Sequence, residues 1–347
     1  MAVEAKEGRV LYASVSPHIR ERTSIPDIMY AVIASLCPAL FASVYFFGLR
    51  ALLVVAIGML SAVLTEALAL RLLRKPVTVS DGSALVTGML LGFVLPPSVP
   101  LWMPVVGSAF AIALGKQVFG GLGCNPMNPA LLGRAFLLAS WPVHMTARWV
   151  APRGGTMSGI DTVTLATPLA MLKEAHTALA TSADKLEGLD VITQIPNAYG
   201  HLFWGRVGGC IGETSVVALL VGAAVLMYLR IIKWRIPFTF IGTVALLTWA
   251  LGGTDGVFTG DPLFHVLSGG LVLGAFFMAT DMVTTPVTHW GRAVFGVGCG
   301  VITVVIRLYG GYPEGVCYSI LVMGATTPLI DAWTKPRVFG QTRKARA

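Results

Sequence analysis

Apolar residues fall into runs of about 16 to 22 residues, separated by short segments rich in Pro, Gly or charged residues. A helix needs about 20 apolar residues to cross the hydrocarbon core of a bilayer, so each run predicts a membrane-spanning helix. The third run is closed by Pro96 and Pro97, which predicts a short or broken span. The predicted spans are residues 27–48, 51–72, 84–98, 102–119, 127–142, 213–231, 237–253, 262–279, 293–309 and 315–333.

The composition supports a lipid environment. Hydrophobic residues make up 55% of the 347 residues and charged residues only 12%, whereas soluble domains average about 25% charged residues. The first 26 residues carry several basic side chains but no apolar core, so no cleavable signal peptide is expected. The fold class predicted is therefore an all-α polytopic membrane protein with about ten transmembrane helices.

The basic residues predict the orientation of the chain. An even number of spans puts both termini on one side, and most of the 25 Lys and Arg residues fall on that side. Because basic residues favour the cytoplasmic face, both termini are expected in the cytoplasm and residues 143–212 outside. The net charge of +8 then reflects this bias and attraction to anionic lipid, and no nucleic-acid partner is expected.

Two pairs of segments resemble each other across the chain. "TGMLLGFVLPP" at 87–97 matches "SGGLVLGAFFMAT" at 268–280, and "FGGLGCNPMNPALL" at 119–132 matches "YGGYPEGVCYSIL" at 309–321. Both matches are offset by five spans, an odd number, which predicts a five-plus-five inverted repeat. The alternative is a chance likeness between Gly-rich transmembrane segments.

These features divide the chain into five parts. They are a cytoplasmic N-terminal segment (1–26), a first transmembrane repeat (27–142), an external loop (143–212), a second transmembrane repeat (213–333) and a basic cytoplasmic tail (334–347).

Inverted repeats place binding sites where interrupted helices expose backbone groups near the repeat interface. Asn125 and Asn128, each followed by Pro, and Asp281, followed by Thr284 and Thr285, fit this description on the cytoplasmic side. Ordinary turn formation is the alternative interpretation, since Asn-Pro and Asp-x-x-Thr are good turn formers.

Charged residues within or near the predicted spans give a second set of candidates, whereas the cysteines give none. The five cysteines are scattered without a C-x-x-C pair, so no iron–sulfur cluster is expected on this chain alone. Charged residues within or near spans are functional candidates by default. They are Glu66, Lys116, Arg134, Glu213 and Arg307.

The loop 143–212 contains the stretch "DTVTLATPLAMLK", residues 161–173. Pro168 predicts the first turn of a helix, and Thr167 before it is a good N-cap. A helix N-terminus also favours a phosphate group. The stretch is therefore compatible with a capping threonine or with a threonine that carries a phosphate.

Asp161, Thr164, Ala166 and Thr167 resemble the D-x-x-[S/T]-G-A-T signature at which flavin transferase joins FMN to a threonine, although Leu165 stands where the signature has Gly. Together with four longer stretches, this motif resembles the D subunit of the Rnf electron-transport complex and the related NqrB subunit of the sodium-pumping NADH:quinone reductase. Those stretches are "SDGSALVTGMLLGFVLPPSVPLW" (80–102), "GCNPMNPALLGRAFLLASWP" (123–142), "GAFFMATDMVTTPVTHWGR" (274–292) and "IRLYGGYPEGVCYSILVMGATTPLID" (306–331).

The resemblance implies covalent FMN on Thr167, with Thr162 and Thr164 as secondary candidates. It also implies a second, non-covalent flavin (riboflavin in the NqrB relative) nearer the cytoplasm, for which Asn125, Asn128 and Asp281 are the candidate residues. The chain would have no catalytic residue of its own, because the flavin supplies the redox chemistry.

The same resemblance implies one component of a complex in the bacterial inner membrane that couples electron transfer between ferredoxin and NAD⁺ to Na⁺ or H⁺ movement. Its partners would be the Rnf subunits A, B, C, E and G, and flavin transferase during maturation. Two other interpretations remain: an NqrB-type subunit, which usually has a longer N-terminal segment, and a channel or transporter with inverted repeats and no redox role.

Overall fold

The computed structural model describes residues 3–5, 9–11, 23–147, 149–150, 152, 167–173, 198–253, 257–312 and 314–336. Helices dominate these residues. The principal helices are α1 (Ile25–Phe47), α2 (Leu49–Leu72), α3 (Ser83–Phe93), α4 (Trp102–Ile112), α5 (Pro129–Ser140), α6 (Pro142–Thr146), α9 (Ala198–Trp204), α10 (Val216–Tyr228), α11 (Arg235–Leu251), α12 (Pro262–Leu267), α13 (Leu271–Leu273), α14 (His289–Tyr309) and α15 (Val316–Trp333).

Three short helical elements and one strand pair complete the described structure. The helical elements are a 3-10 turn η1 (Val79–Asp81) and two π-helices, η2 (Ala113–Gln117) and η3 (Gly274–Met278). Near the N-terminus, β1 (Val3–Ala5) pairs antiparallel with β2 (Arg9–Leu11). This strand pair departs from the all-α prediction, but the rest of the described fold agrees with it.

The start of α1 shows how local sequence sets a helix boundary. Ser24 and Asp27 form a reciprocal capping box, and a proline lies in the first turn. These groups satisfy backbone N–H groups that would otherwise lack a partner at the helix start. The helix ends at Gly48, whose φ of 75° is accessible to glycine at little energetic cost.

Every predicted span overlaps helical structure, but several of the helices are shorter than the predicted spans. In the part of the chain that the structure describes, four helices are long and apolar enough to cross a membrane: α1, α2, α14 and α15. The helices α3, α5, α10 and α11 are apolar and shorter. The boundary predicted for the third span is wrong at the C-terminal end, because α3 ends at Phe93 and not at residue 98.

The predicted span 262–279 is not one continuous helix. It consists of α12, a break at residues 268–270, α13 and η3. Gly269 in the break has a φ of 69°, a left-handed conformation that glycine adopts without steric conflict. Broken helices and π-helices expose backbone groups inside a helical bundle, and both are common at functional sites.

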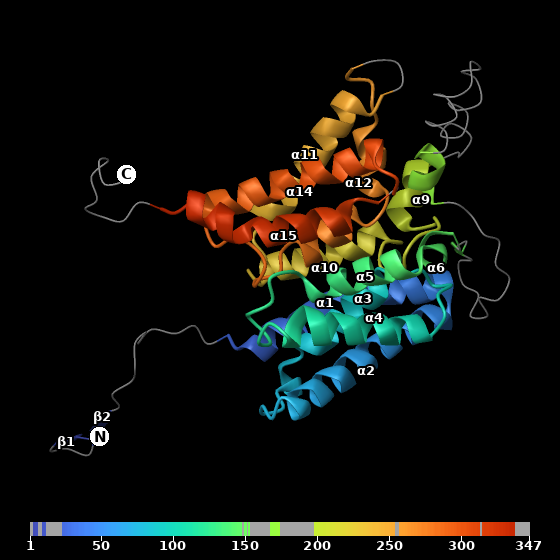
Figure 1. Cartoon of the computed structure of the whole chain (residues 1–347). Coiled ribbons are helices and arrows are strands. Elements are labelled where there is room, and N and C mark those ends of the chain that lie inside the picture. Colours follow the sequence, from blue (N-terminus) through green and yellow to red (C-terminus); the bar gives the residue numbers. More distant parts are fainter. Residues whose placement is uncertain are drawn as a thin grey trace.

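The two halves of the chain form two adjoining groups of helices (Figure 1), with α1 to α4 below, α11 to α15 above, and α5, α6 and α10 at about the same height between them. The halves meet where α1 packs against α10 and α5 packs against α15. Corresponding pairs also pack within each half: α2 with α4 and α11 with α14, then α4 with α5 and α14 with α15.

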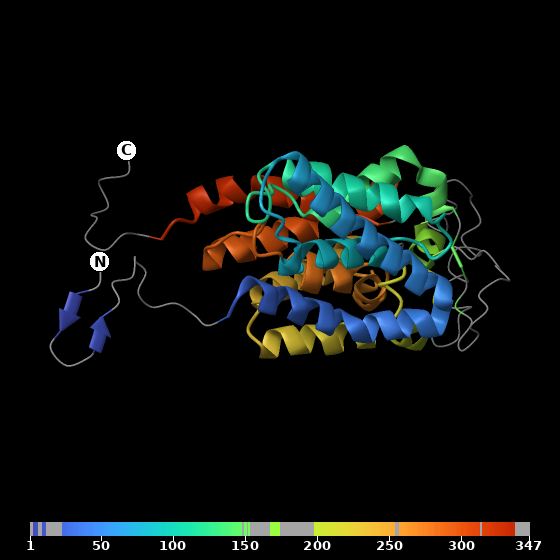
Figure 2. The same ribbon diagram turned by 90° about the horizontal axis from the view of Figure 1, so that it is seen from below.

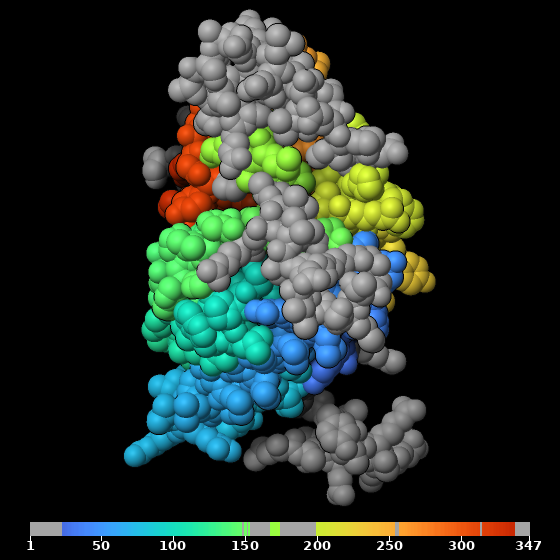
Figure 3. All heavy atoms as spheres, turned by 90° about the vertical axis from the view of Figure 1, so that its right-hand side faces the viewer, coloured from blue at the N-terminus to red at the C-terminus, as the bar shows by residue number. Residues whose placement is uncertain are grey.

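The bundle has two distinct ends. In Figures 1 and 2, α1 begins and α15 ends at the left, whereas α6 and α9 lie at the right. Figure 3 looks onto the right-hand end and shows residues 167–173 in lime. At this end α9 packs against α10 and α12, and Lys173 donates to the carbonyls of Gly310 and Tyr312, so both segments lie against the second half. The two candidate sites described next lie at these opposite ends.

Candidate functional site

Thr167 is the N-cap of a helix, as its sequence context predicts. Residues 168–173 are helical, and the backbone N–H of Ala170 donates to the Thr167 Oγ1 at 3.2 Å. The Thr167 side chain is buried, with 5% of the residue exposed. The other residues of the predicted motif, Asp161, Thr164 and Ala166, and the secondary candidate Thr162 lie outside the described residues.

A cavity of about 360 Å³, open solvent included, adjoins Thr167. Its wall is formed by residues 167–169, α9, the segment before α10 and the break between α12 and α13. The lining residues are Thr167, Pro168, Leu169, Leu202, Val207, Gly208, Gly209, Glu213, Thr214, Leu267, Gly269 and Glu314.

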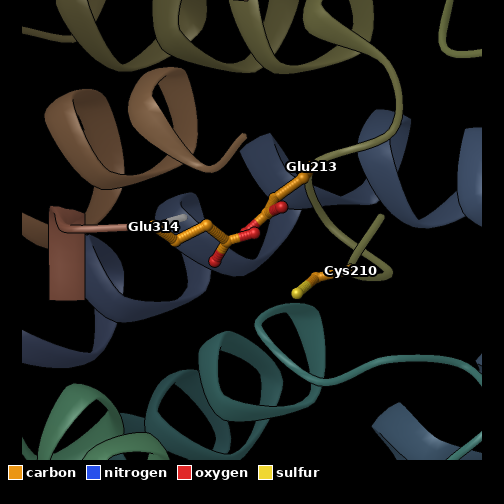
Figure 4. A group of neighbouring side chains, drawn as sticks. All are labelled: Cys210, Glu213 and Glu314. Atoms are coloured by element: carbon orange, nitrogen blue, oxygen red, sulfur yellow. The ribbon is translucent and has the colours of Figure 1, made fainter. Parts of the chain in front are cut away.

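A cluster of charged side chains borders this cavity. The guanidinium of Arg134, on α5, forms ion pairs with Glu213, at 3.5 Å, and with Glu314. The Arg134 Nη2 also lies 3.7 Å from the Cys210 Sγ. Figure 4 shows the two carboxyl groups facing each other with Cys210 beside them. One carboxyl oxygen of Glu213, one of Glu314 and the Cys210 Sγ all lie within 4.8 Å of one another.

The sequence singled out Arg134 and Glu213 in this cluster, but it missed Glu314. Glu314 is a single acid in the Gly- and Pro-containing turn before α15, and it is separated from Arg134 by 180 positions. The only sequence feature that pointed to Glu314 was its position, next to a predicted span and inside the repeat segment 309–321.

The second cavity lies at the opposite end of the bundle, beside the first turn of α1. Its volume is about 860 Å³ with open solvent included. Asn125, Asn128 and Asp281 all line it. The structure therefore brings together the two clusters that the sequence predicted to form one site.

Hydrogen bonds hold Asn128 and Asp281 in place. Asn128 caps α5 by accepting from Ala130 N at 3.0 Å, and its Nδ2 donates to the Met278 carbonyl at 3.2 Å. Asn128 thus links the start of α5 to the end of η3. Asp281 accepts from the Thr284 hydroxyl at 3.2 Å, and burial raises the pKa of the Asp281 carboxyl above its usual value.

A buried ion pair lies at the wall of this second cavity. The Lys116 ammonium, on η2, contacts the Glu66 Oε1 at 2.5 Å and the Ser83 Oγ at 2.6 Å. Gln117 donates to the same glutamate oxygen at 2.8 Å. Both charged residues are almost fully buried, so the Lys116 charge is compensated by Glu66 at the base of the cavity. The sequence identified both charges as candidates but did not predict that they form a pair.

Comparison with known proteins decides the family. A sequence profile described as the NQR2, RnfD, RnfE family matches residues 12–340. The chain belongs to this family. The match includes the residues that line both cavities and the segment that carries Thr167.

Three relatives illustrate the likeness. The D subunit of the "Proton-translocating ferredoxin:NAD(+) oxidoreductase complex" of Clostridium ljungdahlii is 48% identical, over 99% of this chain and 100% of its own length. The D subunit of the "Na(+)-translocating ferredoxin:NAD(+) oxidoreductase complex" of Acetobacterium woodii is 50% identical, over 96% of each chain. The D subunit of the "Ion-translocating oxidoreductase complex" of Halorhodospira halophila is 40% identical, over 94% of this chain and 95% of its own.

Two of these relatives are named for different ions although their identities to this chain are almost equal. Overall similarity therefore does not select between H⁺ and Na⁺.

Proposed function

We propose that this family member is the flavin-carrying D subunit of an Rnf-type complex that couples electron transfer between ferredoxin and NAD⁺ to Na⁺ or H⁺ translocation. The names of its relatives support the type of complex. The position of Thr167, buried beside a cavity at one end of the bundle, supports its role as an electron carrier. The flavin would supply the redox chemistry, and the protein would bind and orient it.

In this proposal, FMN is joined to Thr167 through a phosphoester bond to the Oγ1. The residues present fit such a group. Thr167 offers a hydroxyl at the wall of a cavity, and Gly208 and Gly209 leave the cavity free of side chains at their positions. Arg134 supplies a positive charge that offsets the acidic side chains of the same wall.

A second, non-covalent flavin, riboflavin by resemblance, is proposed for the cavity lined by Asn125, Asn128 and Asp281. Most of its wall is apolar, and a few amide, hydroxyl and carboxyl groups converge on it. This combination suits a flat aromatic ring with polar edges, because apolar side chains contact the faces and polar groups fix the orientation.

The proposed topology places about ten membrane spans in a five-plus-five inverted repeat, with both termini in the cytoplasm. The common end at which α1 begins and α15 ends supports a shared side for the termini. The Thr167 cavity would then lie towards the outer face and the second cavity towards the cytoplasm. The membrane would be the bacterial inner membrane.

The proposed partners are the Rnf subunits A, B, C, E and G, and flavin transferase during maturation. Iron–sulfur clusters and nucleotide sites would lie on those other subunits. Within the described residues, the thiols of Cys37, Cys124, Cys210, Cys299 and Cys317 form no disulfide.

The observation that carries the proposal is the capping threonine beside a cavity, because a structural cap alone needs no adjoining space. The test is to express the full-length chain with and without flavin transferase, in cells supplied with flavin. A flavin-fluorescent band on a denaturing gel is expected only with the transferase, and it should be lost in Thr167→Val. A wild-type band without fluorescence would favour a non-redox channel or transporter.

A further inference from the structure

Glu213 and Glu314 belong to the wall of the Thr167 cavity, but the proposed function gives them no role. Glu213 is 7% exposed, and its Oε1 has no hydrogen-bond partner among the described residues. Buried ionised carboxylates without full hydrogen bonding are energetically unfavourable. The arrangement of the pair therefore requires a physical explanation.

One carboxyl oxygen of Glu213 lies within 4.8 Å of one carboxyl oxygen of Glu314, and the two carboxyl groups face each other in Figure 4. An ionised carboxylate only accepts hydrogen bonds. A hydrogen bond between two carboxyl groups therefore requires one proton on the pair. Two like charges at this separation in a buried site also favour protonation of one of them.

Other charged and titratable groups face the pair from several elements. From α5, Arg134 contacts both carboxyl groups. With one shared proton the two carboxyl groups carry a single negative charge, which the positive charge of Arg134 balances. From α14, Arg307 directs its donors to the carbonyls of His265, at 2.6 Å, and Ser268, at 3.2 Å. The thiol of Cys210 lies beside the pair.

The remaining nearby groups are engaged with backbone carbonyls. On α15, the Cys317 thiol donates to the Leu131 carbonyl at 3.4 Å. The Lys173 ammonium donates to the carbonyls of Gly310 and Tyr312. Arg134 is thus the only cation among the described residues for which an ion pair with either carboxyl group is found.

The break between α12 and α13 makes room for the pair. A methyl group on Gly270 would lie 2.6 Å from the Glu213 Oε1, and one on Gly269 would lie 3.9 Å from the Glu314 Cγ. The backbone at Gly270 thus lies close to the Glu213 carboxyl, beside the cavity.

We propose that Glu213 and Glu314 bind one shared proton at neutral pH, and that negative charge in the Thr167 cavity raises the proton affinity of this pair. The inference rests on the proposed function, because the phosphodiester of FMN on Thr167 supplies the charge. One unit charge about 10 Å away, at an effective dielectric constant of about 20, shifts a titration midpoint by roughly one pH unit, a tenfold change in proton affinity.

The same linkage connects the pair to electron transfer. An electron that arrives in the cavity from a reduced carrier of the complex adds one negative charge. A proton from the aqueous phase then forms one O–H bond on a Glu213 or Glu314 that was ionised, which restores the net charge of the cavity. The coupling is reciprocal, so protonation of the pair also favours the arrival of the electron.

Infrared spectroscopy over a pH titration tests the proposal on the full-length chain, purified from cells that express flavin transferase. A protonated-carboxyl band is expected at pH 7 and should shift on ¹³C-glutamate labelling. The band should be lost in Glu213→Gln and in Glu314→Gln, because each variant removes one partner of the shared proton. Glu66→Gln is the matched control, since Glu66 is also buried but pairs with Lys116 at the other end of the bundle.

In Thr167→Val the titration midpoint of the same band should fall by about one pH unit. Absence of a glutamate-sensitive band in the wild type would overturn the shared proton, and this readout needs no variant to fold. An unchanged midpoint in Thr167→Val, when mass spectrometry shows FMN on the wild type, would overturn the coupling. A wild type that lacks FMN but keeps the band would refute the proposed function and still support the shared proton.

Discussion

Asp281 illustrates how one side chain serves both local structure and a candidate site. Its carboxyl accepts from the Val283 N–H, at 3.4 Å, and from the Thr284 hydroxyl, which are turn contacts predictable from the sequence. The same residue lines the cavity that also contains Asn125 and Asn128. A neutral, isosteric substitution separates these two roles.

Asp281→Asn is expected to lower electron transfer through the assembled complex several-fold while it leaves covalent flavin on Thr167 unchanged. The reason is that the substitution changes only the charge at the second cavity, and the two cavities lie at opposite ends of the bundle. The measurement is the ferredoxin-dependent reduction of NAD⁺ by membranes, with in-gel fluorescence as the control. Full activity with normal assembly would leave Asp281 as a turn-forming residue.

The same variant has a predicted effect on stability against pH. Burial raises the pKa of Asp281 in the folded state, so ionisation of this residue disfavours the folded state. Its contribution to stability is fully present below the ordinary Asp pKa of about 3.9 and is lost as the pH rises through the raised value. In detergent, the melting temperature of the wild type should therefore fall relative to that of Asp281→Asn across this window. Parallel curves for the two proteins would contradict the assignment.

At this scale the sequence predicts contacts between near neighbours and misses those between distant residues. The cap by Thr167 was predicted from the adjacent Pro168, whereas for Asn128 the sequence indicated a turn and not the cap of α5 that the structure shows. The pairing of Arg134 with Glu314 depends on tertiary structure, because α5 and the turn before α15 are brought together only by packing of the two halves.

At the scale of elements, α2 and α3 are packed with their backbones in close contact. A methyl group on Gly88 would lie 2.6 Å from both the carbonyl oxygen of Gly58 and the Cα of Met59. Small residues allow such backbone approach, which is a main source of helix association in membranes. The sequence predicts the use of glycine here but not which helix lies opposite.

Gly88→Ala is therefore expected to destabilise the purified protein by about 1–3 kcal/mol, because backbone atoms cannot move aside as a side chain can. Thermal unfolding in detergent measures the effect. Gly242→Ala, on α11, is the matched control, since a methyl group there meets nothing within 4 Å. Equal melting temperatures for the two variants would show that the α2–α3 contact is looser than described.

Apolar runs predicted where helices occur, because burial in lipid and helix formation depend on local composition. They did not predict the break at residues 268–270 or the π-helices η2 and η3. These irregularities lie inside two of the predicted spans, 102–119 and 262–279. Polar side chains donate to two of the carbonyls there: Asn128 to that of Met278, and Arg307 to that of Ser268.

At the scale of the whole molecule, orientation in the membrane rests on the distribution of basic residues. The structure adds that α1 begins and α15 ends at one end of the bundle, and that Thr167 lies at the other. One accessibility measurement therefore fixes the side of both cavities.

Ser182→Cys, in the loop 143–212, should react with a membrane-impermeant thiol reagent from the outside of intact cells. The result is expected because the positive-inside bias puts this loop outside. The wild type is the control, since its five cysteines set the background. Labelling only after the cytoplasmic face is opened would reverse the proposed topology.

The central claim is that Thr167 carries covalent FMN, and peptide mass spectrometry tests it most directly. Trypsin cleavage after Arg153 and Lys173 releases residues 154–173. The protein is taken from cells that express flavin transferase and have flavin available. The peptide should carry the mass of FMN less one water, and fragmentation should place it on Thr167; Thr167→Val should yield only the unmodified peptide. An unmodified wild-type peptide would contradict the account and leave Thr167 as a helix cap alone.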